Sequence, residues 1–104
     1  MNYSFFGTCS NDHNQLFGCL RTILNQTISP KEIILVNSGD SNIELDIGNM
    51  INQEKIKFVY IHKKLARVES LNLALDNSTA DYSFRFDTRT RFSKDYAEKG
   101  LKVG

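Results

Sequence analysis

Four short polar segments carry most of the side chains in this sequence that could bind a ligand, and each follows an apolar run. They are residues 8–12, 37–41, 63–67 and 87–91. Asn11 and Asp12 open a helical pattern, where free backbone N–H groups and the positive end of the helix dipole can hold an anion or a polar ligand. Simple N-capping is the alternative role for these two residues. Asn37–Asp40 offers amide, hydroxyl and carboxylate groups in a turn cluster, and an ordinary turn before a helix is the alternative there.

Several common kinds of binding site are excluded because their sequence motifs are absent. No G-x-G-x-x-G follows the first apolar run and no G-x-x-x-x-G-K-[ST] occurs, which excludes a dinucleotide fingerprint and a P-loop. The third apolar run ends in His62-Lys63-Lys64, where a phosphoryl-receiver domain would place an aspartate. Cys9 and Cys19 form no C-x-x-C pair, and no Cys/His cluster has zinc spacing. We expect both thiols to be small buried groups.

The elements that must position these segments alternate between strand and helix. We expect strands over residues 3–8, 32–37, 57–62 and 82–87, and helices over 11–26, 41–51, 67–77 and 93–101. The run Ile33–Val36 has no polar alternation, which is typical of a strand covered on both faces. Residues 82–87 alternate aromatic with polar side chains, which indicates a strand with one less-buried face.

Helix starts and helix faces can also be predicted from these patterns. Asp12 with Gln15, and Ser41 with Glu44, have the spacing of capping boxes, and Ser93 is placed to cap the last helix. The third helix is expected to bury four apolar side chains, namely Val68, Leu71, Ala74 and Leu75.

This order predicts an α/β fold in which helices cover both faces of a mostly parallel sheet, a three-layer α/β/α arrangement. The 104 residues suit one domain spanning 1–104. In open sheets of this kind, ligands bind beyond the carboxyl ends of the strands, where the strand order reverses. We therefore expect the four polar segments to surround one cleft.

Composition and charge limit the partners. The net charge of +1 gives no overall attraction to nucleic acid, so no nucleic-acid partner is expected. No stretch approaches the ~20 apolar residues of a membrane span, and Met1–Thr8 lacks the features of a signal peptide. The expected location is the cytoplasm, with a peripheral position on the inner face of the membrane left open.

Taken in order, the polar segments and their neighbours resemble glycosyltransferase family 2. Ser10-Asn11-Asp12 matches the family's polar stretch after the first strand, and Thr22–Thr27 reads T-I-L-N-Q-T against S-I-L-N-Q-T. Lys31–Asp40 is similar to F-E-I-I-L-V-D-D-G-S. The remaining similarities are Ala66–Asn72 to G-K-x-x-A-L-N, and Ala80–Arg89 to G-[DE]-Y-x-x-x-x-D-x-D.

The resemblance implies a GT-A fold that binds a nucleotide-diphosphate sugar across the strand ends. It implies that Thr8–Ser10 wall the base and ribose, that Ser38 hydrogen-bonds the pyrimidine edge, and that Arg67 approaches the diphosphate. Asp87 would lie near the ribose and a Mg²⁺ or Mn²⁺ ion. The full set of implied nucleotide-sugar-binding residues is Thr8, Ser10, Asn11, Asp12, Asn37, Ser38, Arg67, Asp87 and Arg89.

This chain departs from the family pattern at two places. Asn37 and Ser38 stand where the family has paired aspartates, so base recognition should be weaker or different. Arg89 stands where a second metal-binding aspartate is usual, and a guanidinium cannot ligate a cation. Either Arg89, with Arg91, clamps the diphosphate in place of the metal, or the site is degenerate. A third possibility is that Arg85, Arg89 and Arg91 only form a solvated basic face.

The hypothesis that follows is a donor-binding domain for transfer to a saccharide acceptor in polysaccharide or cell-surface glycan synthesis. Arg85-Phe86-Asp87 is similar to the R-x-D of relatives that build extracellular polysaccharide precursors. The family's acceptor half, with its general base, would follow Gly104, so we expect a truncated chain that is inactive alone and open to homo-oligomerisation. A non-catalytic module that keeps the fold, and an unrelated flavodoxin-like domain, are the alternatives.

Overall fold

The structure is a computed structural model that describes residues 2–51 and 55–103. Its strands are Tyr3–Cys9 (β1), Glu32–Asn37 (β2), Lys57–His62 (β3) and Tyr82–Phe86 (β4). Its helices are His13–Leu24 (α1), Glu44–Ile51 (α2), Arg67–Asp76 (α3) and Tyr96–Val103 (α4). The predicted alternation of strands and helices is confirmed. Within the described part of the chain, every helix is too short or too polar to cross a bilayer.

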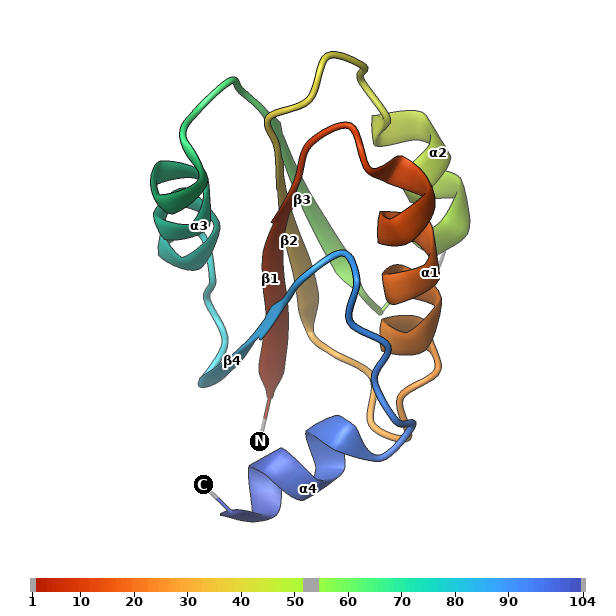
Figure 1. The fold of residues 1–104 in the computed structure, drawn as a ribbon. Coiled ribbons are helices and arrows are strands. Elements are labelled where there is room, and N and C mark those ends of the chain that lie inside the picture. The colour runs from red at the N-terminus through yellow and green to blue at the C-terminus, as the bar shows by residue number, and fades with distance from the viewer. Residues whose placement is uncertain (1, 52–54, 104) are drawn as a thin grey trace.

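All four strands run parallel, in the order β3-β2-β1-β4. Figure 1 shows α1 and α2 on one face of this sheet and α3 on the other, so the predicted three-layer α/β/α class is confirmed. The chain builds outward from β1 to β3 and then crosses back through α3 to place β4 on the other side of β1. The strand order therefore reverses between β1 and β4, which is where such sheets bind ligands.

The larger core lies between the sheet and the helices α1 and α2. Tyr3, Phe5 and Phe86 of the sheet pack there against apolar side chains of α1 and α2, including Leu16 and Ile47. A smaller core under α3 is formed by Phe6, Ile34, Val36 and Ala74. All six positions of β2 are buried, as predicted for a strand covered on both faces.

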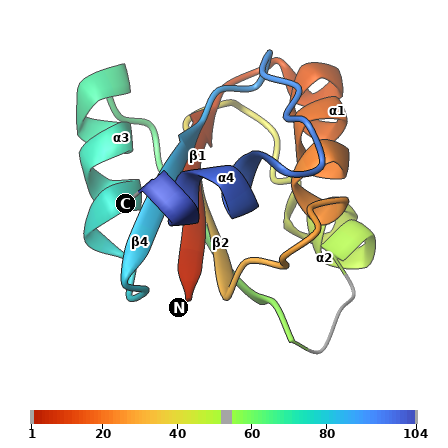
Figure 2. The same cartoon turned by 90° about the horizontal axis from the view of Figure 1, so that it is seen from below.

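Helix α4 lies at the end of the sheet opposite to the carboxyl ends of the strands. It is below the sheet in Figure 1 and in front of it in Figure 2. Buried Gln26 holds the segment that leads into it: Nε2 donates to the carbonyl oxygen of Ser93 (2.7 Å), and Oε1 accepts from the N–H of Ala97 (3.0 Å). The N–H of Thr27 also donates to the carbonyl oxygen of Lys94 (2.7 Å). In the L-N-Q-T match of the family resemblance, Gln26 and Thr27 therefore have a structural role.

The predicted helix caps are wrong. Asp12 occupies the N-cap position of α1, but its side chain makes no cap hydrogen bond. Helix α2 begins only at Glu44, whose N–H donates to Oδ1 of Asn42 (2.9 Å), so Ser41 lies too far upstream to cap it. Helix α4 begins at Tyr96, three residues after Ser93.

The predicted inner face of α3 is only half right. Ala74 is buried and Leu71 packs on the smaller core, but the side chains of Val68 and Leu75 are 69% and 46% exposed. The face that contacts the sheet passes through Ser70 and Ala74, four residues apart. Val68 and Leu75 lie to one side of this face, toward solvent. The polar residue Ser70 is buried against the sheet, and these two apolar side chains are not.

Candidate functional site

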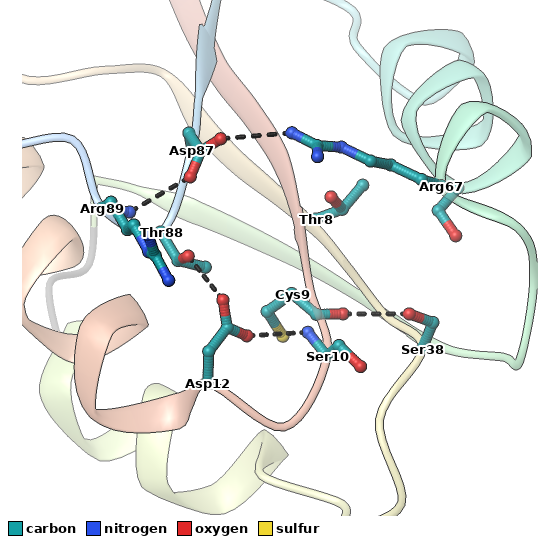
Figure 3. A pocket seen from close by; sticks show the side chains of 10 residues that line it. Thr8, Cys9, Ser10, Asp12, Ser38, Arg67, Asp87, Thr88 and Arg89 are labelled. Carbon is teal, nitrogen blue, oxygen red and sulfur yellow. Dashed lines mark hydrogen bonds and ion pairs between the residues drawn. The ribbon is translucent and has the colours of Figure 1, made fainter.

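An open cleft of about 500 Å³ lies at the carboxyl ends of β1 and β4, between them and the start of α3 (Figure 3). Its lining residues are Thr8, Cys9, Ser10, Asp12, Ser38, Arg67, Ser70, Asp87, Thr88 and Arg89. Seven of the nine residues expected from the sequence line the cleft. The other two, Asn11 and Asn37, do not, and Cys9, Ser70 and Thr88 are additions.

The pleat of the strands decides which polar residues face the cleft. Phe6 and Val36 point to the side that α3 covers, so Thr8 and Ser38, two positions further along, lie on the same side. Asn37 points the other way and is fully buried: Nδ2 donates to the hydroxyl of Tyr60 (3.0 Å) and Oδ1 accepts from the N–H of Gly39 (2.8 Å). Asn37 therefore shapes the turn after β2 and has no access to a ligand in the cleft.

Asn11 joins two loops at the rim. Its Oδ1 accepts from the N–H of Asp40 (3.0 Å), and its Nδ2 lies 3.4 Å from Oδ2 of Asp40. Lys64 also contacts the carboxylate of Asp40 (2.6 Å), and these contacts lower the pKa of that exposed group, the Lys64 hydrogen bond and charge being the main causes. The role of Asn11 in this structure is to hold the β2–α2 loop beside the β1–α1 loop.

Asp12 connects the loops that follow β1 and β4. Its carboxylate accepts from the N–H of Ser10 (2.9 Å) and from the hydroxyl of Thr88 (2.5 Å). Partial burial alone would raise the pKa of Asp12, but these two hydrogen bonds outweigh it, and the pKa lies below its usual value. The carboxylate is therefore ionised at neutral pH. Its engagement with Ser10 and Thr88 explains why it does not cap α1.

Asp87 is held between two arginines at the mouth of the cleft. Its Oδ2 lies 3.3 Å from Nη2 of Arg67, and its Oδ1 accepts from the backbone N–H of Arg89 (3.2 Å). The side chains of Arg67 and Asp87 are 76% and 41% exposed, and ion pairs this exposed contribute little stability. The Arg67–Asp87 pair can therefore open for an incoming ligand at low cost.

Arg89 and Arg91 have different surroundings, although both are exposed. Arg89 lines the cleft. The guanidinium of Arg91 instead donates to the carbonyl oxygen of Thr88 (2.8 Å) and to Oε1 of Gln15 on α1 (3.0 Å). The expectation that Arg91 joins Arg89 in clamping a ligand is therefore not met, because Arg91 is used to tie the β4–α4 loop to α1.

Both carboxylates at the cleft are already engaged by protein groups, which a divalent metal ion would have to displace. Magnesium requires near-octahedral oxygen coordination, and each oxygen of Asp12 and Asp87 already accepts a hydrogen bond or faces a guanidinium. Over residues 2–51 and 55–103, no three acidic, histidine or cysteine side chains form a cluster that could hold an ion.

Two additions to the lining have notable side chains. Burial raises the pKa of the Cys9 thiol to about 12, so the group is protonated at neutral pH and is no nucleophile. The side-chain oxygen of Ser70 is buried and has no hydrogen-bond partner. Cys9 and Thr88 lie within the segments 8–12 and 87–91 that the sequence singled out, Thr88 at the variable position of the D-x-D pattern. Ser70 lies outside all four segments, and no motif identified it.

Comparisons with known proteins identify the family and the fold. The family model described as "Glycosyl transferase family 2" matches residues 8–103. "Glycosyltransferase GlyA" of Streptococcus pneumoniae serotype 4 (strain ATCC BAA-334 / TIGR4) is 28% identical over 89 residues, which is 85% of this chain and 13% of that protein.

Among solved structures, "S. aureus TarS 1-349 in complex with UDP" has a similar fold, with a TM-score of 0.79 and 16% identity. The match covers 98% of this chain and 31% of that one. The chain therefore spans only a minor part of the length of both relatives.

Proposed function

The chain belongs to glycosyltransferase family 2, and from this premise we propose that its cleft binds the nucleotide-diphosphate part of an activated sugar. The observation that carries the proposal is the meeting of residues 8–10, 12, 38, 67, 70 and 87–89 around one polar cleft at the strand-order reversal. A uridine nucleotide is the first candidate, because the structural relative TarS was solved with UDP.

Ser38 is proposed to contact the base. Its hydroxyl donates to the carbonyl oxygen of Cys9 (3.2 Å), which leaves the hydroxyl oxygen free to accept a hydrogen bond. A pyrimidine N–H is a suitable donor. Thr8 and Ser10 are proposed to flank the base and ribose. A neutral serine replaces the charge-assisted bond of an aspartate, so this contact is expected to be weak.

The diphosphate is proposed to lie against Arg67 and Arg89. Two guanidinium groups can pair with phosphate oxygens in a bidentate manner and can offset the charge of the diphosphate without a metal ion. Binding would exchange the Arg67–Asp87 contact for an Arg67–phosphate contact. We therefore propose nucleotide binding that does not depend on Mg²⁺ or Mn²⁺.

In sugar transfer, the oxygen of an acceptor hydroxyl bonds to the anomeric carbon, the bond from that carbon to the diphosphate oxygen breaks, and the hydroxyl proton passes to a base. Arg67 and Arg89 would stabilise the negative charge on the departing diphosphate. We assign no general base: Glu98 bonds to Thr27 and Lys102, and Asp95 pairs with Lys99, at the end of the sheet away from the cleft. A saccharide acceptor, in polysaccharide or cell-surface glycan synthesis, remains part of the proposal.

Calorimetry with UDP and GDP, each with Mn²⁺ and with a chelator, tests the proposal. We expect binding that the chelator leaves intact and that weakens roughly 10-fold or more in Arg67→Gln and in Arg89→Gln. Arg85→Gln is the matched control, since Arg85 is exposed on β4 outside the cleft. Absence of binding to every nucleoside diphosphate would refute the proposal, and strict dependence on Mn²⁺ would refute its metal-free form.

A non-catalytic binding module is the second candidate, and the engagement of both Asp87 oxygens favours it. It predicts nucleotide affinity without release of nucleoside diphosphate from a nucleotide sugar. Release in the presence of a saccharide acceptor would exclude it.

A further inference from the structure

The first turn of α3 faces the cleft with unsatisfied hydrogen-bond donors. Figure 1 shows that this helix starts beside the carboxyl ends of the strands and runs back along the sheet. Its N-cap residue is Ala66, whose side chain has no hydrogen-bonding group and caps none of the first N–H groups. The opening N–H groups of a helix have no partner within it, and the dipole makes this end positive.

A second observation at the same place is the hydroxyl of Ser70. The residue is only 1% exposed, it lines the cleft, and its Oγ has no hydrogen-bond partner. The backbone N–H of Ser70 already donates to the carbonyl oxygen of Ala66 (2.9 Å), so the hydroxyl is the group left unsatisfied. An unpaired buried hydroxyl costs free energy that alanine would avoid, which points to a partner supplied from outside the protein.

The charges around this hydroxyl favour an anionic partner. Arg67 lies on the same turn, and its guanidinium reaches Asp87 at the cleft mouth. The acidic groups that face the region are Asp87 and Asp12. Asp87 pairs with the guanidinium of Arg67 and accepts from the backbone N–H of Arg89, and Asp12 is engaged with Ser10 and Thr88 on the α1 side. Glu69, also in the first turn of α3, is exposed and does not line the cleft.

We infer that Ser70 and the first turn of α3 form a phosphate subsite, in which the Ser70 hydroxyl donates to a phosphate oxygen of the bound diphosphate. The inference rests on the proposed function and extends it, because it assigns the diphosphate to the α3 side of the cleft. It also makes Ser70 a residue that distinguishes a nucleoside diphosphate from a nucleoside.

Ser70→Ala tests the subsite, with Ser41→Ala as the matched control because Ser41 is exposed and outside the cleft. The ligands are UDP, uridine and inorganic pyrophosphate, measured by calorimetry. We expect Ser70→Ala to weaken UDP and pyrophosphate about 10-fold and to leave uridine unchanged. Its melting temperature should stay the same or rise, because no protein partner is lost.

The outcomes separate this inference from the proposed function. UDP binding that Ser70→Ala does not change overturns the subsite and leaves the proposed function standing. An equal loss for uridine and UDP shows that the hydroxyl contacts the nucleoside, which also overturns the subsite. Pyrophosphate binding that requires Ser70, without any nucleotide binding, overturns the proposed function alone. A wild-type chain that binds neither overturns both.

Discussion

Two arginines close together after β4 show how far residue type alone can mislead. Arg89 and Arg91 are both exposed, and both can be considered as phosphate ligands from the sequence. The structure places Arg89 in the cleft and commits Arg91 to the carbonyl oxygen of Thr88 and to Gln15. Only the arrangement of the loop against α1 separates them, and no local sequence pattern encodes that arrangement.

This difference can be measured. We expect Arg91→Ala to lower the free energy of unfolding by about 1 kcal/mol, because three hydrogen bonds from its guanidinium are lost. Arg89→Ala should leave that free energy nearly unchanged and weaken nucleoside diphosphate binding instead. Urea unfolding and calorimetry on both variants check the pair. Equal destabilisation by the two substitutions would show that Arg89 is structural as well.

Glu32 is a buried carboxylate at the opposite end of the sheet from the cleft. Its oxygens accept from the hydroxyl of Ser4 (2.8 Å) and from the N–H (2.6 Å) and hydroxyl (3.0 Å) of Thr79. Burial alone would raise the pKa of Glu32, but these hydrogen bonds outweigh it and hold the pKa below its ordinary value of 4.5. The charge thus anchors the turn between α3 and β4.

The sign of the pH dependence follows from this lowered pKa. The unfolded chain takes up the proton first as pH falls, so the stabilisation is complete above pH 4.5 and is lost as pH drops through the folded-state pKa. We expect Glu32→Gln to cost about 1–2 kcal/mol at pH 7 and progressively less below about pH 4.5. Urea unfolding across pH, with exposed Glu44→Gln as the control, measures it. A pH-independent difference would contradict the assignment.

At the scale of elements, the two loops that follow β1 and β2 are in direct contact. A side chain at Gly39 would overlap the backbone carbonyl of Ser10 and approach Oδ1 of Asn11 (2.8 Å). The backbone N–H of Ser38 also donates to the carbonyl oxygen of Cys9 (2.9 Å). Gly39 is thus required for the close approach of the loops that follow β1 and β2.

Gly39→Ala is expected to push these loops apart. The overlap is with backbone, which cannot rotate away, so we expect a loss of about 1–3 kcal/mol in the free energy of unfolding. Gly48→Ala is the matched control, because a side chain there meets nothing within 4 Å, and in helix α2 it should stabilise slightly. Thermal unfolding of both variants decides, and an unchanged melting temperature in Gly39→Ala would refute the argument.

Elements were predictable where one strong pattern decided them. The unbroken apolar run of β2 and the strand–helix alternation fixed the fold class and brought seven expected residues to one cleft. The helix caps and the buried face of α3 were not predictable from local sequence patterns, because tertiary contacts determine both. Asp12 bonds to Thr88 instead of its own helix, and Ser70 faces the sheet where Val68 was expected.

At the scale of the whole molecule, the proposed ligand would contact the ends of β1 and β4, on the two sides of the strand-order reversal, and the start of α3. Binding to the folded chain alone stabilises it, by roughly 2.7 kcal/mol when the ligand is present at 100 times Kd. For a domain of this size, we expect the melting temperature to rise by about 10 °C or more with saturating UDP. A thermal-shift experiment measures this, with uridine as the weaker comparison. No shift at any UDP concentration would count against binding to the folded state.

During folding, the cleft can form only after β4 has paired with β1, because the cleft lies at the ends of these two strands. Strands β1, β2 and β3 are consecutive neighbours, whereas β4 pairs with β1 after a crossover that passes over the sheet. Closing that loop is the least local step of assembly, and such steps are slow. During refolding, we therefore expect helical signal to return before the chain can hold a nucleotide.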